Sequence, residues 1–223
     1  MTIYIAQREG TGGPIADAAA TYTSTSTGRT AAALVDGMGH DADIVRLAPM
    51  LAETAARVGA VRGALAGLLS AGLVVTDPGP DAVGVLAVTR EDGRAELVWA
   101  GDCRAYRWDG TALEVLTTDH TLAAYLSRAA KDAGDVPVTA LADFVGVTLG
   151  LAVPATVPYV SVPAGGVLIL TTDGVHDQES RDVIEALVHK HDSDPQALAN
   201  ALVAAAAPNA EGYRDDATAV VIS

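Results

Sequence analysis

Hydrophobic and polar residues follow distinct patterns along the chain, and each pattern predicts a different kind of element. Over residues 41–58, apolar residues recur at i, i+3, i+4 and i+7, which predicts an amphipathic helix. Asp41 or Asp43 can cap the start of this helix. A second helical stripe covers residues 61–71, and the turn sequence "TDPGPD" follows it.

Shorter stretches, either alternating or wholly apolar, predict β-strands. The sequence "EDGR" between two such stretches is typical of a hairpin turn. The predicted strands cover residues 1–7, 21–27, 29–35, 83–90, 95–100, 104–108, 156–162, 167–172 and 217–222. Further helical patterns cover residues 122–131, 181–190 and 195–206.

The order of these elements favours an α+β fold. Strands come first, a helix pair follows, then more strands, and finally helices and a last strand. Two packed β-sheets (a β-sandwich) flanked by antiparallel helix pairs would bury both the strand faces and the helix stripes. The predicted architecture is therefore a four-layer αββα arrangement. No linker-like segment divides the chain, so we expect residues 1–223 to form a single domain.

The composition narrows the classes of function. The chain carries 28 acidic and 14 basic residues, a formal charge of −14, which argues against binding to a nucleic-acid backbone. Cys103 is the only cysteine, so no disulfide can form within the chain. No stretch reaches the ~18 uninterrupted apolar residues of a membrane span, and the first residues do not resemble a signal peptide. We expect a soluble, cytoplasmic protein that binds neither nucleic acid nor membrane, while its oligomeric state stays open.

Five aspartates lie at the ends of predicted strands. Asp36 follows "AALV", Asp102 follows "LVWAG", Asp173 follows "VLILTT", Asp215 lies shortly before "ATAVVI", and Asp17 shortly before "TYTSTST". Clustered carboxylates repel one another unless protons or cations neutralise them, and an all-oxygen set suits Mn²⁺ or Mg²⁺. Aspartate is also an ordinary turn residue, so the spacing alone leaves both interpretations open.

Six short motifs occur in a characteristic order over residues 16–222. They are "IADAAATY", "VDGMGH", "GDCRAY", "LTTDHT", "LILTTDGVHD" and "RDDATAVVI". None is specific alone, but the ordered set resembles the metal-dependent serine/threonine protein phosphatases of the PPM (type 2C) family, with a bacterial character. The resemblance implies a β-sandwich flanked by helix pairs, with a two-metal site at one end.

The resemblance also implies metal ligands, residue by residue. Asp36 would bridge two Mn²⁺ or Mg²⁺ ions, and the carbonyl of Gly37 would bind one of them, since glycine leaves the backbone accessible. Asp173 and Asp215 would hold the first ion.

Two further aspartates match outer positions of such a site. Asp17 matches a ligand that acts mainly through metal-bound water, and Asp102 matches a ligand of a third, weaker ion shared with Asp173. Water bridging two cations yields hydroxide near neutral pH, which attacks phosphorus in line. Asp36 and Asp173 would thus act through that water, and Cys103, where serine is usual, is interpreted as structural.

The sequence departs from the family where phosphate would bind. Gly12 stands where an arginine usually grips phosphate, and Arg8 is the candidate to replace it. Ala16 replaces the usual Glu or Gln beside the N-terminal aspartate. Asp216 stands where asparagine is usual, and an added carboxylate would repel a phosphate ester.

The leaving group of a phosphate ester needs a proton donor. Met38 occupies the position where eukaryotic members have histidine. His40 is the nearest histidine, and it is interpreted either as a proton donor or as a loop residue that faces solvent. His120 follows the family's "DH" pattern and is expected to be structural.

Three functions follow from these observations. The first is a Mg²⁺/Mn²⁺-dependent phosphatase whose partner is a phosphorylated protein from a serine/threonine kinase pathway. The second, favoured by the departures at Gly12, Ala16 and Asp216, is a pseudophosphatase that binds or regulates a phosphorylated partner. The third is a phosphomonoesterase for small molecules. Residues 126–150 match the family's substrate-shaping flap, and their shortness leaves the substrate open.

Overall fold

The computed structural model describes residues 2–129, 141 and 144–223. The end of the predicted helix 122–131 and a central part of the predicted flap, residues 126–150, lie outside the described residues. Among the helices that are described, none combines the length and the hydrophobicity that crossing a bilayer requires.

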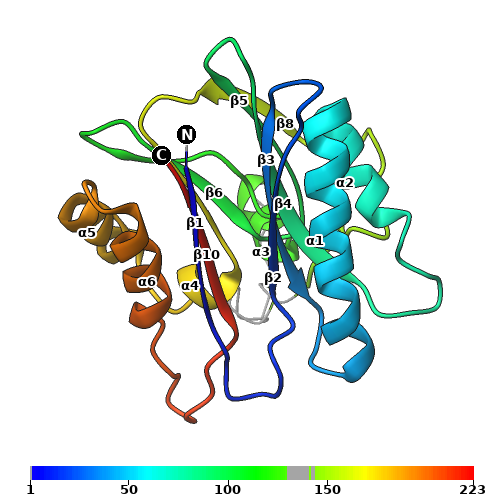
Figure 1. Ribbon diagram of the computed structural model, residues 1–223. Coiled ribbons are helices and arrows are strands. Elements are labelled where there is room, and N and C mark those ends of the chain that lie inside the picture. Colours follow the sequence, from blue (N-terminus) through cyan, green and yellow to red (C-terminus); the bar gives the residue numbers. More distant parts are fainter. Residues whose placement is uncertain (1, 130–140, 142–143) are drawn as a thin grey trace.

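Two five-stranded sheets lie face to face, and every strand pairing in them is antiparallel (Figure 1). In spatial order, the first sheet contains β1 (Ile3–Arg8), β10 (Ala217–Ile222), β9 (Val167–Thr171), β6 (Arg104–Trp108) and β7 (Leu113–Val115). The second contains β2 (Ala18–Thr23), β3 (Thr30–Gly37), β4 (Ala82–Thr89), β5 (Arg94–Ala100) and β8 (Tyr159–Pro163).

A helix pair covers the outer face of each sheet (Figure 1). The pair α1 (Ala42–Arg62) and α2 (Ala64–Gly72) packs on the second sheet, while α5 (Arg181–His191) and α6 (Pro195–Ala205) lie on the side of the first. Two short helices, α3 (Leu122–Arg128) and α4 (Asp173–His176), complete the described elements. The predicted α+β, four-layer arrangement is confirmed.

The layering explains why the inner strands are apolar at almost every position. In β3, Ala31 and Ala33 pack towards α1, whereas Ala32 and Leu34 pack into the layer between the sheets. Because successive side chains of a strand point to opposite faces, a strand covered on both sides has no polar face. Continuous apolar runs therefore mark the middle of this fold.

Several predicted boundaries were wrong, and turn chemistry explains the largest error. The hydroxyl-rich stretch 21–27 was predicted as a strand, but β2 ends at Thr23. Ser24 then begins a turn in which its N–H donates to the Arg29 carbonyl at 2.9 Å and its carbonyl accepts from Gly28 N–H at 2.9 Å. Serine and threonine side chains support such turns, since they bond to nearby backbone groups.

Other differences are local. The first predicted helix extends to Arg62, and the second begins only after Gly63, whose φ of 98° breaks the helical path. The strand predicted at 156–162 is β8, which begins at Tyr159. The three-residue strand β7 and the single turn of α4 were missed because both are too short for a periodic pattern.

A close approach between α1 and α2 gives a test of the packing. A Cβ atom at Gly67 would lie 2.6 Å from the Ala55 carbonyl oxygen and 2.7 Å from the Cα of Gly59. Gly67→Ala should therefore lower the free energy of unfolding by about 1–3 kcal/mol, even though alanine favours helix by about 1 kcal/mol. Urea unfolding measures the change, and Ser70→Ala in the same helix is the control that adds no volume. Stabilisation by Gly67→Ala would contradict the described packing.

Candidate active site

Four aspartates from separate strand ends line one cavity of about 380 Å³. Asp36 is the penultimate residue of β3, Asp102 lies between β5 and β6, Asp173 begins α4 after β9, and Asp215 precedes β10. We call this space the acidic cavity. The described residues that line it are Asp36, Gly37, Met38, Gly39, His40, Val83, Asp102, Val145, Asp173, Tyr213, Asp215 and Asp216.

Close packing requires glycine next to two of these aspartates, Asp36 and Asp102. A Cβ atom at Gly37 would lie 2.5 Å from Cγ1 of Ile44 and 2.8 Å from the Ala16 carbonyl oxygen. Gly101 has a φ of 94°, and a Cβ there would lie 2.2 Å from Cβ of Val83. Packing alone therefore requires glycine beside Asp36, in addition to the carbonyl access inferred from the sequence.

Asp36 and Asp173 form the electrostatic centre of the cavity. Loss of hydration raises the pKa of Asp36 well above its ordinary value, and the charges of Asp173, Asp17 and Asp102 raise it further. The pKa of Asp173 is raised to about 8, first by burial and then by the charges of Asp102 and Asp215. The two carboxyl groups share a hydrogen bond, which raises the pKa of Asp36 and lowers that of Asp173. Both carboxyl groups therefore favour the protonated form when no cation is bound.

Asp102 completes the acidic lining. Burial raises its pKa to about 6, opposed by a backbone hydrogen bond. Of the described residues that shift the pKa values of these three carboxyls, Arg104 is the cation, and it lowers the pKa of Asp102. Its guanidinium is bonded to Asp119, with Nη2 at 2.6 Å from Oδ2. Protons therefore carry most of the neutralisation in this cavity.

Asp17 does not line the cavity. Its Oδ2 atom accepts hydrogen bonds from the hydroxyls of Thr172 at 2.9 Å and Thr218 at 2.7 Å. Its side chain is buried, and burial raises its pKa to about 7 against the effect of these hydrogen bonds. The structure thus buries Asp17 and leaves it outside the set of aspartates that line the cavity.

Asp216 clamps the N-terminal loop to the site. Its Oδ1 atom accepts from the N–H of Gly10 and its Oδ2 atom from the N–H of Ala16, each at 2.7 Å. The sequence interpretation saw an added carboxylate where asparagine is usual. The structure gives a reason for that carboxylate, because both oxygens accept from a backbone N–H, and an amide has one acceptor oxygen.

His40 belongs to the wall of the acidic cavity, so its interpretation as a solvent-facing residue was wrong. Its side chain is 23% exposed, with Nδ1 at 3.6 Å from Oδ2 of Asp216 and Nε2 at 3.9 Å from Oδ1 of Asp215. A Cβ atom at Gly12 would lie 2.8 Å from Nε2, and one at Gly13 would lie 2.9 Å from the Cβ of His40. The bare N-terminal loop makes room for this imidazole.

Arg8 does not reach the cavity, and its assignment to phosphate is corrected. Its Nη1 atom donates to the carbonyls of Val203 at 3.3 Å, Ala204 at 3.0 Å and Ala206 at 3.0 Å. The last carbonyls of a helix have no partner within it, so a guanidinium at the end of α6 satisfies them. The sequence could not reveal this contact between residues far apart in the chain.

The sequence interpretation missed Tyr213 as a lining residue. Burial raises the pKa of its phenol to about 12, and the charge of Asp215 and a hydrogen bond to it act in the same direction. The only available signal was its position two residues before Asp215. Cys103 is fully buried, and burial followed by the charge of Asp36 raises the pKa of its thiol well above the ordinary value, which agrees with a structural role.

A family comparison identifies the fold and these strand-end motifs. The sequence profile of the family described as "Stage II sporulation protein E (SpoIIE)" matches residues 26–223. The chain belongs to the SpoIIE/PPM family of bacterial serine/threonine phosphatases. No curated protein sequence matches it significantly.

Solved phosphatases of this family share the whole fold. The S. agalactiae serine/threonine phosphatase has a TM-score of 0.80 at 18% identity, covering 99% of this chain and 98% of that chain. The PPM Ser-Thr phosphatase MsPP from Mycobacterium smegmatis, in complex with cacodylate, has a TM-score of 0.77 at 22% identity, covering 100% and 98%. The Mycobacterium tuberculosis phosphatase PstP/Ppp has a TM-score of 0.73 at 20% identity, covering 99% and 97%. At these identities the likeness shows the fold.

Members of the SpoIIE/PPM family are typically metal-dependent, and the donor set of the acidic cavity fits hard divalent ions. The lining aspartates supply oxygen donors, and the pKa values of Asp36, Asp102 and Asp173 are raised first by burial and then by neighbouring carboxylates, whose negative charge a cation would offset. Within the described ranges, no three His, Cys, Asp or Glu side chains stand in the arrangement of a formed metal site. The carboxyls of Asp36 and Asp173 instead bond to each other, a contact that a shared cation would replace.

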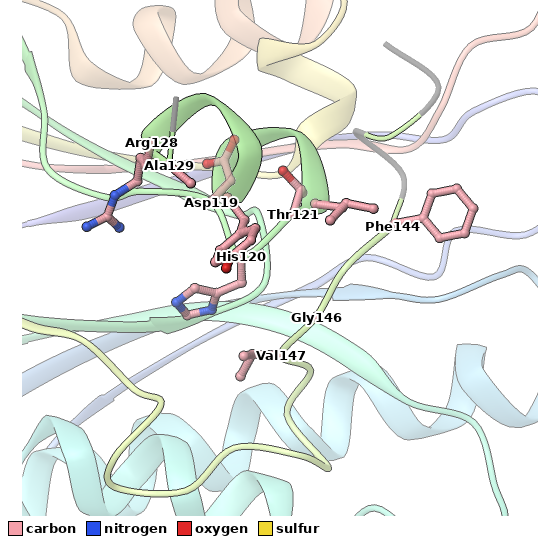
Figure 2. Close-up of a pocket in the computed structure, with 10 residues that line it drawn as sticks. Asp119, His120, Thr121, Arg128, Ala129, Phe144, Gly146 and Val147 are labelled. Carbon is pink, nitrogen blue, oxygen red and sulfur yellow. The ribbon is translucent and has the colours of Figure 1, made fainter. Parts of the chain in front are cut away.

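A larger cavity, of about 660 Å³, is lined by residues that include Asp119, His120 and Phe144 (Figure 2). Its described lining residues come from α3, from the turn before it and from the segment that carries Phe144, Gly146 and Val147. Val145 of the same segment lines the acidic cavity. His120 contributes to the larger cavity and also has a structural role, because its Nδ1 accepts from Gly101 N–H at 3.1 Å.

The clamp at Asp216 predicts a stability effect. Asp216→Asn keeps the shape of the side chain but leaves the N–H of either Gly10 or Ala16 without its acceptor. The free energy of unfolding should fall by about 1–3 kcal/mol, the cost of an unsatisfied buried donor. Guanidinium unfolding measures the change, with the exposed Asp192→Asn as the matched control. Equal stability of Asp216→Asn and wild type would rule out the clamp.

The raised carboxyl pKa values predict a pH dependence in the metal-free protein. Asp173 and Asp17 hold protons up to about pH 8 and about pH 7 in the folded state, whereas the unfolded chain releases them near 3.8. Between these limits the folded state binds more protons, so stability falls as pH rises. Melting temperatures measured with EDTA from pH 5 to 8 should fall more steeply for wild type than for Asp173→Asn, which cannot ionise there. Parallel slopes would contradict the assigned pKa values.

Proposed function

We propose that this chain is a Mn²⁺- or Mg²⁺-dependent phosphatase that hydrolyses phosphoserine and phosphothreonine in proteins. The observation that carries the proposal is the meeting of four strand-end aspartates around one cavity, in a chain of the SpoIIE/PPM family. The complex of the M. smegmatis relative with cacodylate adds support, because cacodylate is a tetrahedral oxyanion.

The proposed ion ligands are the residues around the centre of the cavity. Asp36, the Gly37 carbonyl, Asp173 and Asp215 would hold two core ions, and Asp102 with Asp173 a third. When bound, such ions supply hydroxide at neutral pH and offset the charge of the phosphoryl group. Asp17 would act on the ions indirectly, through bound water, because hydrogen bonds from two threonine hydroxyls hold it outside the lining of the cavity.

The side chains of the cavity would supply a proton donor and an apolar surface. The departing serine or threonine oxygen needs a proton, and His40 is the imidazole on the cavity wall. Val83 and Val145 give part of the wall an apolar surface, which limits the water around the reacting group. The buried Cys103 is unsuited to act as a nucleophile, because its thiol is kept protonated.

A protein substrate is favoured over a small phosphate ester by the larger neighbouring cavity. The segment around Val145 borders both spaces, so a phosphorylated side chain in one would place its flanking residues beside the other. Tyr125, Phe144 and Val147 line the larger cavity and suit apolar side chains. A metabolite that ends near its phosphate would leave this surface unused.

Hydrolysis of p-nitrophenyl phosphate tests the proposal. Turnover should require Mn²⁺ or Mg²⁺, and Asp173→Asn should lower kcat by roughly 100-fold or more, because an interaction with the charge of the transition state is lost. Asp192→Asn is the matched control and should retain wild-type turnover. Full turnover in EDTA, or in Asp173→Asn, would refute the metal assignment.

A pseudophosphatase is the second candidate, and one observation favours it. Among the described residues, no arginine lines the acidic cavity. Binding of a phosphopeptide without turnover, in folded protein that binds Mn²⁺, would support this candidate. Rapid hydrolysis of small phosphate esters with no activity on phosphopeptides would instead support the third function, a small-molecule phosphomonoesterase.

A further inference from the structure

A phosphate ester in the acidic cavity needs hydrogen-bond donors, and the lining offers few. Most of the described lining side chains are carboxyl groups or apolar groups. Apart from protonated carboxyls, the lining side chains that carry an N–H or O–H group are His40 and Tyr213. Apart from protonated carboxyls, a side-chain hydrogen bond from this wall to a phosphoryl oxygen must therefore come from one of these two.

The arginines of the surrounding loops are engaged elsewhere. Arg8 is bonded to carbonyls at the end of α6. Arg214, although adjacent to Tyr213, donates from Nη2 to the Glu9 carbonyl at 2.8 Å. Neither guanidinium lines the acidic cavity.

A tight turn before β10 holds Tyr213 in place. The N–H of Tyr213 donates to Oδ1 of Asn209 at 2.9 Å, and its carbonyl accepts from Asn209 N–H at 2.7 Å. The ring also borders the bare N-terminal loop, since a Cβ atom at Gly12 would lie 3.3 Å from Cε2 of Tyr213 and 2.8 Å from Nε2 of His40. The two rings thus flank the position of Gly12, and Tyr213, 41% exposed, reaches the mouth of the cavity.

We propose that the Tyr213 hydroxyl binds a phosphoryl oxygen of the substrate beside His40, in the role that a guanidinium would otherwise fill. This rests on the proposed function, because it names a substrate contact of the same site. In the structure the hydroxyl lies close enough to Asp215 for this carboxyl to raise the pKa of the phenol. Rotation about its Cζ–O bond turns the hydrogen towards the phosphoryl group, while Asp215 keeps the hydrogen bond from Asp216 N–H at 2.8 Å.

Tyr213→Phe tests this role, because it removes the hydroxyl and keeps the ring against Gly12. In the Mn²⁺-loaded enzyme, KM for p-nitrophenyl phosphate and the inhibition constant of inorganic phosphate should both rise about tenfold or more, as for the loss of a hydrogen bond to a charged group. The change in kcat should be smaller, and the Mn²⁺ concentration for half-maximal activity should stay within about twofold. Tyr159→Phe, at an exposed position of β8, is the matched control.

The outcomes separate this inference from the proposed function. Calorimetric titration of inorganic phosphate into the Mn²⁺-loaded proteins measures binding without turnover. If wild type is inactive but binds phosphate more tightly than Tyr213→Phe, the phosphatase proposal fails and the role of Tyr213 stands. Equal phosphate affinity of the two proteins overturns the role of Tyr213, whether or not the protein is active. Should Tyr213→Phe lose stability, Tyr213→His restores a ring with an N–H donor, and only a binding role predicts recovered phosphate affinity.

Discussion

Repulsion among aspartates at one edge of the sandwich is the constraint on which the site depends. Asp36, Asp102 and Asp173 come from different strand ends, and burial raises the pKa of each carboxyl. Neighbouring aspartates raise these pKa values further: Asp173, Asp17 and Asp102 act on Asp36, and Asp102 and Asp215 act on Asp173. Buried cores between and outside the sheets hold the strands in this arrangement. The free energy gained by packing these cores offsets the repulsion between the carboxyl groups. The core therefore stabilises the fold and also holds the aspartates together when no cation is bound.

The two ends of the chain complete the wall of the cavity together. β1 pairs with β10, and Asp216 fixes the loop that follows β1 by two backbone hydrogen bonds. Gly12 and Gly13 then leave the space that His40 occupies. The absence of side chains at these two positions is therefore important, since a side chain there would displace the imidazole from the cavity.

The sequence predicted the layers and most of the site, and its errors have definable causes. The strand-end positions of Asp36, Asp102, Asp173 and Asp215, together with the order of the motifs, grouped these residues at one edge, and the structure places all four around the acidic cavity. Arg8 was misassigned because the carbonyls that bind it belong to α6, about 195 residues further along the chain. The sequence could not show that Asp17 is held by two threonine hydroxyls or that Asp216 is held by backbone N–H groups. These partners are far away in the chain, so no local pattern reveals them.

The position of β10 has a consequence for biosynthesis. This strand lies between β1 and β9 in its sheet, yet it is translated after every other described element (Figure 1). A nascent chain that lacks it therefore has β1 without a partner and neither Asp215 nor Asp216. The wall of the acidic cavity that Tyr213, Asp215 and Asp216 form therefore cannot be completed before β10 emerges from the ribosome and pairs with β1 and β9.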